Sequence, residues 1–309
     1  MARKCDIVIV GGGPAGLAAG IYAARARRCT FLIEKEIPGG QIALAAMVEN
    51  YPGFPEGVNG FDLSQAMKAQ GEKYGLSLVF AEVTGVTSSG PLHVVHTSDG
   101  DYMTKAVILT SGAAYRRLGV PGEERLTGRG VSYCATCDAA FFRGQEVAVV
   151  GGGDSAIDEG LTVARYASKV YVIHRRSRLR ATPILQERAF AEPKMQFIWD
   201  TVVTEIGGDE QVSGLRLRNV TTGAEWGLSV SGVFVFIGQQ PSTDYLGGRL
   251  KLDEGGHVFV NEWMETEIPG IFAAGDVRRN AARQIVSAAG DGATAAIRAD
   301  QYISENFSA

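Results

Sequence analysis

The stretch Gly11-Gly12-Gly13-Pro14-Ala15-Gly16 recurs later in the chain as Gly151-Gly152-Gly153-Asp154-Ser155-Ala156. Each copy follows an apolar run typical of a buried strand and opens a stretch with helical periodicity. A second apolar run then leads to a marker residue 23 positions after the first glycine: Glu34 in one copy and His174 in the other. This order of strand, glycine turn, helix and strand predicts two dinucleotide-binding βαβ units.

The predicted elements of the two units correspond in position. Strands are expected over 6–10, 30–33 and 103–110 in the first unit and over 146–150, 169–173 and 232–237 in the second, with helices over 15–26 and 155–166. A further short strand at 271–274 ends in Gly275-Asp276 and has no counterpart earlier in the chain. The simplest arrangement inserts the second unit into the first.

The two marker positions differ in charge, which predicts two different nucleotides. In such units the glycines let the backbone approach a pyrophosphate at a helix N-terminus, and the marker residue meets the adenosine ribose. An acid such as Glu34 hydrogen-bonds a free 2′-hydroxyl, whereas the basic run from His174 to Arg180 suits a 2′-phosphate. A basic run alone is more often a solvated face, but its matched register with Glu34 favours a phosphate site. FAD and NADPH fit this pair, and Asp276 favours FAD over NAD in the first unit.

Length and composition indicate a protein of about two domains. The 309 residues are 45% hydrophobic and include 40 glycines, many in clusters that suit an α/β nucleotide-binding protein. A net charge of −4 argues against nucleic acid or an anionic membrane as the main partner. No apolar stretch reaches the roughly 18 residues of a spanning helix, and no signal peptide is expected. We therefore predict a cytoplasmic protein of α/β class, with two Rossmann-like, three-layer ββα domains.

The expected domain limits follow from the turn residues at the two crossings, around Pro121-Gly122 and Gln240-Pro241. We predict a FAD domain over 1–115 and 245–309. An NADPH domain over 116–244, carrying a cysteine pair, is predicted to interrupt it.

Cys134-Ala-Thr-Cys137-Asp138 is the candidate reactive centre. This spacing permits a small-ring disulfide that is easily reduced and re-formed, and an adjacent carboxylate can deliver and accept protons. Half of a zinc site and a pair of inert thiols are the alternatives. Cys5 and Cys29 are isolated in sequence, which disfavours zinc, and both are predicted to be small core residues.

These motifs together resemble the low-molecular-weight thioredoxin reductases over essentially the whole chain. The resemblance rests on Gly-Gly-Gly-Pro-Ala-Gly at 11–16, Pro-Gly-Gly-Gln at 38–41, Val-Glu-Asn-Tyr-Pro-Gly-Phe-Pro at 48–55, Cys-Ala-Thr-Cys-Asp at 134–138, Gly-Gly-Gly-Asp-Ser-Ala at 151–156, His-Arg-Arg at 174–176 and Gly-Asp at 275–276 with Arg-Gln at 283–284. Two slight departures are Asp158, where Glu is usual, and Ala139, where Gly is usual.

The resemblance implies a role for each matching residue. Cys137 would face the flavin, Cys134 would attack the disulfide of thioredoxin, and Asp138 would donate the proton. FAD would be bound by Gly11, Gly13, Pro14, Ala15, Gly16, Glu34, Lys35, Gly39, Gly40, Gln41, Asn50, Gly112, Gly275, Asp276, Arg283, Gln284 and Ile285. NADPH would be bound by Gly151, Gly153, Asp154, Ser155, His174, Arg175, Arg176, Arg180, Ile237 and Gly238.

The family likeness also implies a homodimer whose nicotinamide domain swings between two positions. Two other functions stay open on the sequence. One is a reductase of the same fold serving another dithiol protein, such as a glutaredoxin-like or peroxidase-linked partner. The other is a flavin redox sensor without turnover.

Overall fold

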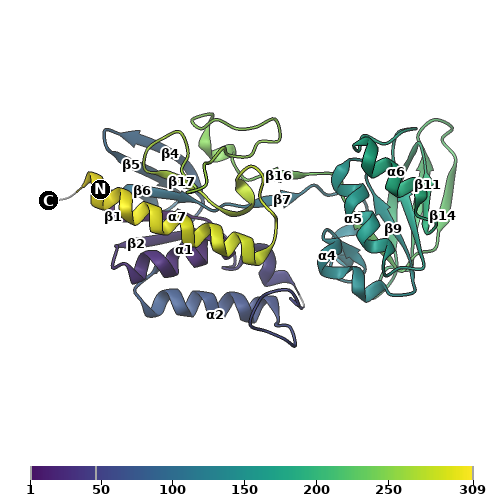
Figure 1. Cartoon of the computed structure of the whole chain (residues 1–309), viewed down its shortest axis with the longest axis horizontal. Helices are drawn as coiled ribbons and strands as arrows, with labels where there is room; N and C mark the ends of the chain where they lie inside the picture. Colours follow the sequence, from purple (N-terminus) through teal and green to yellow (C-terminus); the bar gives the residue numbers. More distant parts are fainter. Residues whose placement is uncertain (1, 46, 308–309) are drawn as a thin grey trace. The chain divides into compact units, whose positions relative to one another are not determined.

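The computed structural model describes residues 2–45 and 47–307, and they divide into two compact units (Figure 1). The first unit comprises the residues up to Ala114 and from Gln240 onward, and the inserted unit is Tyr115–Gln239. Both are of α/β type, so the prediction of two Rossmann-like units is confirmed.

The first unit contains a seven-stranded sheet and the long helices of the chain. Its elements are β1 (Arg3–Val10), α1 (Pro14–Arg25), β2 (Thr30–Glu34), η1 (Gly40–Leu44), α2 (Gly60–Lys73), β3 (Ser77–Phe80), β4 (Val83–Ser89), β5 (Leu92–Thr97), β6 (Gly100–Leu109), η3 (Asp244–Leu246), β17 (Ile271–Ala273), η4 (Gly275–Val277) and α7 (Ile285–Asn306). The strand order is β3-β2-β1-β6-β5-β4, and β17 pairs with the end of β6. Strands β1, β2, β3, β6 and β17 pair in parallel. Strand β5 pairs antiparallel with both of its neighbours, β4 and β6.

Alternation along the strands divides this unit into two hydrophobic cores. Ile7 and Ile9 of β1 pack with α1 and α7 on one face, while Val8 and Val10 pack with β4, β5 and β17 on the other. Successive strand side chains point to opposite faces, so one apolar strand supplies both layers. Helix α1 contacts both α2 and α7, and the three helices run along the same side of the sheet in Figure 1.

Close helix packing depends on a glycine at one point. A Cβ built on Gly292 of α7 would lie 2.0 Å from the carbonyl oxygen of Ala15 in α1. Only glycine allows the two helices to approach this closely, which fixes α7 beside the first glycine turn.

The inserted unit repeats the same design around a five-stranded parallel sheet. Its elements are α3 (Glu123–Leu126), β8 (Val131–Ser132), α4 (Ala135–Asp138), η2 (Ala139–Phe142), β9 (Glu146–Val150), α5 (Asp154–Ala164), β10 (Lys169–Ile173), α6 (Pro183–Ala191), β11 (Met195–Ile198), β12 (Thr201–Gly207), β13 (Gly214–Asn219), β14 (Glu225–Leu228) and β15 (Gly232–Val235). The sheet order is β11-β10-β9-β15-β8, and β12, β13 and β14 form a separate antiparallel sheet. Val147 and Val149 face the core that contains α5, while Ala148 and Val150 face the antiparallel sheet.

Two short strands connect the units: β7 (Ala113–Tyr115) and β16 (Gln239–Pro241). They pair with each other as a two-stranded sheet. Among the described residues, no helix has both the length and the apolar character that crossing a membrane requires.

Candidate active site

The first glycine turn is bonded directly to its marker residue. The Gly11 amide donates to the carbonyl of Ile33 at 2.8 Å, and the Gly12 amide donates to Oε2 of Glu34 at 2.6 Å. The other carboxylate oxygen, Oε1, accepts from the Glu36 amide at 2.8 Å. Glu34 is therefore held against the turn at the carboxyl end of the sheet, where such folds bind ligands.

The start of α1 presents bare backbone. Gly13 is the N-cap residue. Among the residues that the structure describes, no side chain caps the helix, and a Cβ built on Gly13 would meet nothing within 4 Å. Gly39 donates to the Gly12 carbonyl at 2.7 Å, and a Cβ on Gly40 would lie 3.5 Å from the Gly13 Cα. A free helix N-terminus between two glycine segments can accommodate an anionic phosphate group.

Other predicted residues of the first unit also converge here. A Cβ on Gly275 would lie 3.0 Å from the Ala15 Cβ, so η4 starts beside α1. Next to it, burial raises the pKa of Asp276, although Arg283 opposes the shift. Separately, the Asn50 side-chain amide donates to Gln284 Oε1 at 3.0 Å, which joins two residues far apart in sequence.

The remaining residues predicted around the first unit's site have simple placements. Gln41 donates through Nε2 to the Ala113 carbonyl, and Lys35 is exposed with its Nζ 3.8 Å from Glu36. Gly112 has positive φ in open space, Arg283 is exposed with φ 58°, and Ile285 is the first residue of α7.

The second glycine turn reproduces these bonds. The Gly151 amide donates to the carbonyl of Ile173 at 3.1 Å, as Gly11 does to Ile33. The Gly152 carbonyl accepts from the Arg180 amide at 2.7 Å, as Gly12 accepts from Gly39. A glycine loop of the first unit is thus replaced by an arginine-bearing loop in the inserted unit.

The start of α5 is also free of a side-chain cap. Gly153 is its N-cap residue, and the atom nearest to a Cβ built there is a guanidinium nitrogen of Arg180 at 4.0 Å. Asp154 in the first turn accepts from the Thr182 amide at 2.6 Å, while Ser155 is exposed. Ile237 and Gly238 follow β15, and Gly238 accepts from the Arg116 amide at 3.0 Å.

His174 is buried, unlike the three arginines predicted with it. The prediction counted it in the basic run, but it is 5% exposed, and its ring would collide with any Cβ on Gly152. Burial lowers its pKa, as do Arg180, Arg176 and Arg175, so the ring is neutral near pH 7. Its Nε2 is buried with no hydrogen-bond partner among the described residues. His174 supports the turn, while Arg175, Arg176 and Arg180 are exposed.

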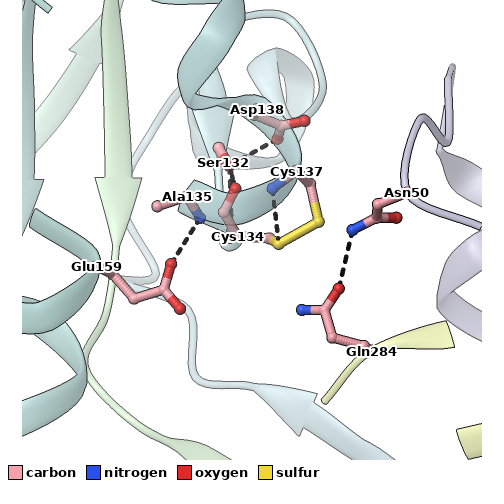
Figure 2. Close-up of a disulfide and its surroundings, with 8 residues drawn as sticks. All are labelled: Asn50, Ser132, Cys134, Ala135, Cys137, Asp138, Glu159 and Gln284. Atoms are coloured by element: carbon pink, nitrogen blue, oxygen red, sulfur yellow. Dashed lines mark hydrogen bonds between the residues drawn. A yellow bond between two sulfur atoms is a disulfide. The ribbon is translucent and has the colours of Figure 1, made fainter. Parts of the chain in front are cut away.

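Cys134 and Cys137 form a disulfide across a single helical turn (Figure 2). Cys134 is the N-cap of α4, its Sγ accepts from the Cys137 amide at 3.2 Å, and the two Cα atoms are 5.4 Å apart. We call residues 134–138 the redox turn. Ala135 within it and Ala139 just after it are buried in the core beside α5 and anchor the turn there. Cys134 is half-buried and Cys137 is exposed. An amide donor close to a sulfur stabilises a thiolate, so the turn suits thiol–disulfide exchange.

Asp138 ends the helical turn of the cysteine pair and is held by Ser132. Its Oδ2 accepts from the Ser132 hydroxyl at 2.7 Å, and the same hydroxyl accepts from the Cys134 amide at 3.1 Å. Burial raises the pKa of Asp138, and the bond from Ser132 partly opposes this shift. A carboxyl group with a raised pKa keeps its proton closer to neutral pH and can act as a general acid.

Several residues of these sites were not predicted from the sequence. Ser132 binds Asp138, Thr110 donates to the Val10 and Gly11 carbonyls, Glu159 accepts from the Ala135 amide, and Asp291 accepts from the Gly275 amide. None of the four belongs to a recognisable motif. Gly12 and Gly152 each contact the marker residue of their unit. Both could have been predicted, because each lies inside a glycine motif.

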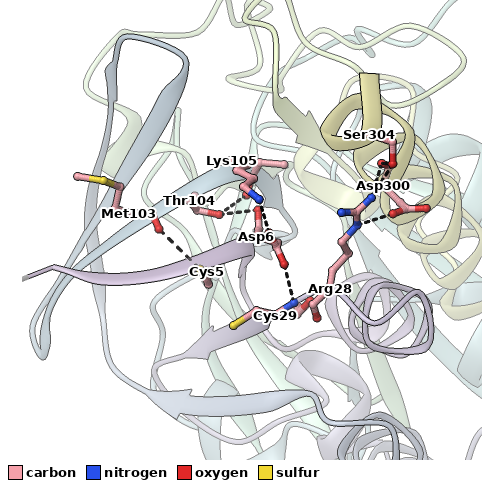
Figure 3. Close-up of polar contacts among 11 residues, drawn as sticks. Cys5, Asp6, Arg28, Cys29, Met103, Thr104, Lys105, Asp300 and Ser304 are labelled. Atoms are coloured by element: carbon pink, nitrogen blue, oxygen red, sulfur yellow. Dashed lines mark hydrogen bonds and ion pairs between the residues drawn. The ribbon is translucent and has the colours of Figure 1, made fainter. Parts of the chain in front are cut away.

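The other two cysteines, Cys5 and Cys29, belong to the first unit, whereas the redox turn belongs to the inserted unit (Figure 3). Cys5 is half-buried, and burial raises its pKa to about 12. Cys29 is exposed, so its prediction as a core residue is wrong. It lies just before β2, where its amide donates to Asp6 at 2.9 Å and its side chain is outside the packed layer.

Comparison with known proteins shows the family to which the chain belongs. A family model described as pyridine nucleotide-disulphide oxidoreductase matches residues 5–292. The thioredoxin reductase of Listeria monocytogenes is 45% identical over 97% of this chain and 94% of its own, and that of Bacillus subtilis is 45% identical over 97% and 95%. The crystal structure of thioredoxin reductase from Streptococcus pyogenes is 44% identical, with a TM-score of 0.93 over 99% of this chain and 100% of that chain. This chain belongs to the pyridine nucleotide-disulphide oxidoreductase family, among the low-molecular-weight thioredoxin reductases.

Proposed function

We propose that this chain is an NADPH-dependent thioredoxin reductase that passes electrons through FAD and the Cys134–Cys137 pair to oxidised thioredoxin. The observation that carries the proposal is the redox turn. A disulfide spans one helical turn that ends in a half-buried carboxyl group, and the same unit holds a glycine turn beside exposed arginines. That combination is chemically suited to reducing another protein's disulfide with electrons from a 2′-phosphorylated nucleotide.

We assign FAD to the first unit. The open backbone at Gly13, the uncapped N-terminus of α1 and the carboxylate of Glu34 fit a pyrophosphate followed by a ribose with a free 2′-hydroxyl. Gly39, Gly40 and Gly275 bring further backbone close to the same turn. The other residues implied by the resemblance, including Asn50, Asp276 and Gln284, are proposed to line the rest of this cofactor.

We assign NADPH to the inserted unit. Its pyrophosphate would meet the amides at the start of α5, and Arg175 and Arg176 are exposed and free to pair with the 2′-phosphate. Bound FAD supplies the redox chemistry of the pathway, since a flavin accepts a hydride from a reduced nicotinamide and returns two electrons to a disulfide.

The cysteine pair then exchanges with the partner. One sulfur attacks the partner's disulfide as a thiolate, which forms a mixed disulfide and releases one partner sulfur. The other cysteine attacks the mixed disulfide, which re-forms the Cys134–Cys137 bond and releases the second partner sulfur. Two electrons and two protons pass to the partner in each cycle.

Asp138 is proposed to manage one of those protons. Burial keeps its carboxyl group protonated to higher pH than usual, so it can protonate the thiolate that leaves when a disulfide is broken. It then recovers a proton from solvent, because reduction of a disulfide consumes protons. The Ser132 hydroxyl donates to this carboxyl group and orients it.

By the same resemblance we propose that the chain works as a homodimer in the cytoplasm, with thioredoxin as its protein partner. The net charge of −4 supports a protein substrate in preference to nucleic acid or an anionic membrane.

Anaerobic reduction tests the proposal. NADPH should bleach the yellow flavin absorbance of the purified holoprotein, and oxidised thioredoxin should restore it. Replacing Cys137 by Ser should leave the flavin reducible and stop thioredoxin turnover. A flavin that bleaches but is not reoxidised by any thioredoxin would favour a sensor, and reoxidation by a glutaredoxin-like protein alone would favour another dithiol partner.

A further inference from the structure

Glu123 is a buried carboxylate held by three donors. It is 2% exposed, its Oε1 accepts from the Leu118 amide and the Tyr133 hydroxyl, both at 2.9 Å, and its Oε2 accepts from the Gly119 amide at 2.8 Å. Among the described residues it forms no ion pair, whereas the adjacent Glu124 is exposed and faces Arg117 at 3.6 Å. A buried carboxylate is costly unless its hydrogen bonds are satisfied, so this arrangement requires all three donors.

Tyr133 connects Glu123 to the redox turn. It immediately precedes Cys134, and its ring stacks on Tyr115 with centroids 5.3 Å apart and an interplanar angle of 20°. The ring of Tyr115 therefore holds the face of the Tyr133 ring, and the carboxylate of Glu123 holds its hydroxyl. Burial raises the pKa of Tyr133, as does Glu123, so the hydroxyl remains a donor at neutral pH.

The Glu123–Tyr133 contact is separate from the contacts that hold the rest of the turn. Ser132 fixes Asp138 and the Cys134 amide, and Glu159 accepts from the Ala135 amide at 3.0 Å. Tyr133 lies between Ser132 and Cys134 in the sequence, so its backbone joins the end of β8 to the first residue of the redox turn. The contact with Glu123 holds the side chain of the residue that immediately precedes Cys134.

We propose that Glu123 is a positioning residue of the dithiol, acting through Tyr133 to hold Cys134 at bonding distance from Cys137. The inference rests on the proposed function only in taking Cys134 and Cys137 as the redox pair. A looser turn lowers the effective concentration of one thiol toward the other, which makes their disulfide easier to reduce.

The test measures the dithiol–disulfide equilibrium of the holoprotein in glutathione buffers, read by alkylation and mass. Glu123→Gln places an amide NH₂ where one carboxylate oxygen accepted, and Tyr133→Phe removes only the hydroxyl. Both should shift the equilibrium toward the dithiol by roughly threefold or more, where tenfold corresponds to about 30 mV for two electrons. Glu124→Gln is the matched control and should not shift it.

A double variant separates positioning from general destabilisation. If Glu123 acts through Tyr133, Glu123→Gln should add little to the shift already caused by Tyr133→Phe. NADPH should still reduce the flavin at the parental rate in each variant. An unchanged glutathione equilibrium in both single variants, or a Glu123→Gln effect that persists in full without the hydroxyl, would overturn the inference.

This readout does not depend on thioredoxin. Failure of the parent protein to reduce thioredoxin would count against the proposed function and leave the equilibrium measurement interpretable. An active parent with unshifted variants would count against Glu123 alone.

Discussion

The Ser132 hydroxyl donates to Oδ2 of Asp138 at 2.7 Å and accepts from the amide of Cys134 at 3.1 Å. One buried hydroxyl therefore links the proposed proton donor to the backbone of the first cysteine. Ser132 ends β8 and Asp138 ends α4, so the strand and the helical turn of the redox loop hold the same carboxyl group.

Asp138→Asn should impair protein reduction without impairing flavin reduction. The amide keeps the size and the Ser132 contact but cannot give up a proton. We expect kcat/KM for thioredoxin to fall on the order of a hundredfold, at the lower end of the range for general acid catalysis. The rate of flavin reduction by NADPH, measured by stopped flow, should be unchanged. Asp158→Asn, at an exposed position on α5, is the control and should leave both rates unchanged.

The same substitution should stabilise the fold at neutral pH. The folded pKa of Asp138 lies above its unfolded value, so the unfolded state releases the proton more readily. Stability from this group is present below the unfolded pKa and is lost as pH rises through the folded pKa. The amide side chain in Asp138→Asn does not titrate, so this variant does not lose this stability as pH rises. The Tm of the variant should therefore exceed the parental Tm at pH 7 and approach it in acid. An equal Tm difference at all pH values would contradict the pKa direction.

Ser132→Ala should move the alkaline limb of thioredoxin reduction to higher pH. The bond from Ser132 favours the charged carboxylate and opposes the effect of burial, so its removal raises the pKa of Asp138 further. The pH profile of kcat/KM is the measurement. A limb that shifts to lower pH would show that the hydroxyl does not act on Asp138 in this way.

Arg175→Ala combined with Arg176→Ala should change the nucleotide preference. A charge-assisted contact contributes about 1.5–3 kcal/mol, so each lost arginine should raise KM for NADPH roughly ten- to a hundredfold. KM for NADH should change little, because NADH has no 2′-phosphate. Arg165→Ala at the end of α5 is an exposed control. Equal increases for both nucleotides would argue against the 2′-phosphate assignment.

Gly13→Ala should preserve the apoprotein fold and weaken flavin binding. A Cβ there meets no protein atom within 4 Å, and the φ of −69° is ordinary for alanine. The methyl group would instead occupy the space proposed for the pyrophosphate. Flavin retained per polypeptide after gel filtration is the readout, and the exposed Gly227→Ala in β14 is the control. Parental flavin content in Gly13→Ala would place the cofactor elsewhere.

The order of attack by the two cysteines can be determined by trapping. The resemblance gives attack on the partner to Cys134 and the flavin side to Cys137. We therefore expect Cys137→Ser, which keeps Cys134, to form the more rapid mixed disulfide with thioredoxin lacking its second cysteine. Faster trapping by Cys134→Ser would reverse the order implied by the resemblance.

Most of the fold was predictable because its signals are local. The predicted strands at 146–150 and 169–173 coincide with β9 and β10, and the predicted helix over 15–26 is α1 displaced by one residue. The first glycine of each turn is also a local requirement. Gly11 and Gly151 have φ of 103° and 150°, and a Cβ on either would collide with the backbone carbonyl of the residue just after a strand, Thr110 or Phe236.

The burial of individual polar groups was not predictable in the same way. His174 stands in a basic run yet is enclosed by the turn it follows, and Cys29 stands beside a strand yet is exposed. Each outcome depends on which distant segment covers the side chain. A pattern of neighbouring residues carries no such information.

The sequence by itself determined the two glycine turns, the charge of their marker residues and the cysteine spacing, since strand and helix periodicity and positive φ are properties of short segments. Only the tertiary structure brought Ser132 into hydrogen-bond contact with Asp138 and Glu123 into contact with Tyr133. Those hydrogen bonds form because packing brings the groups together and excludes water, and both effects depend on the whole folded unit.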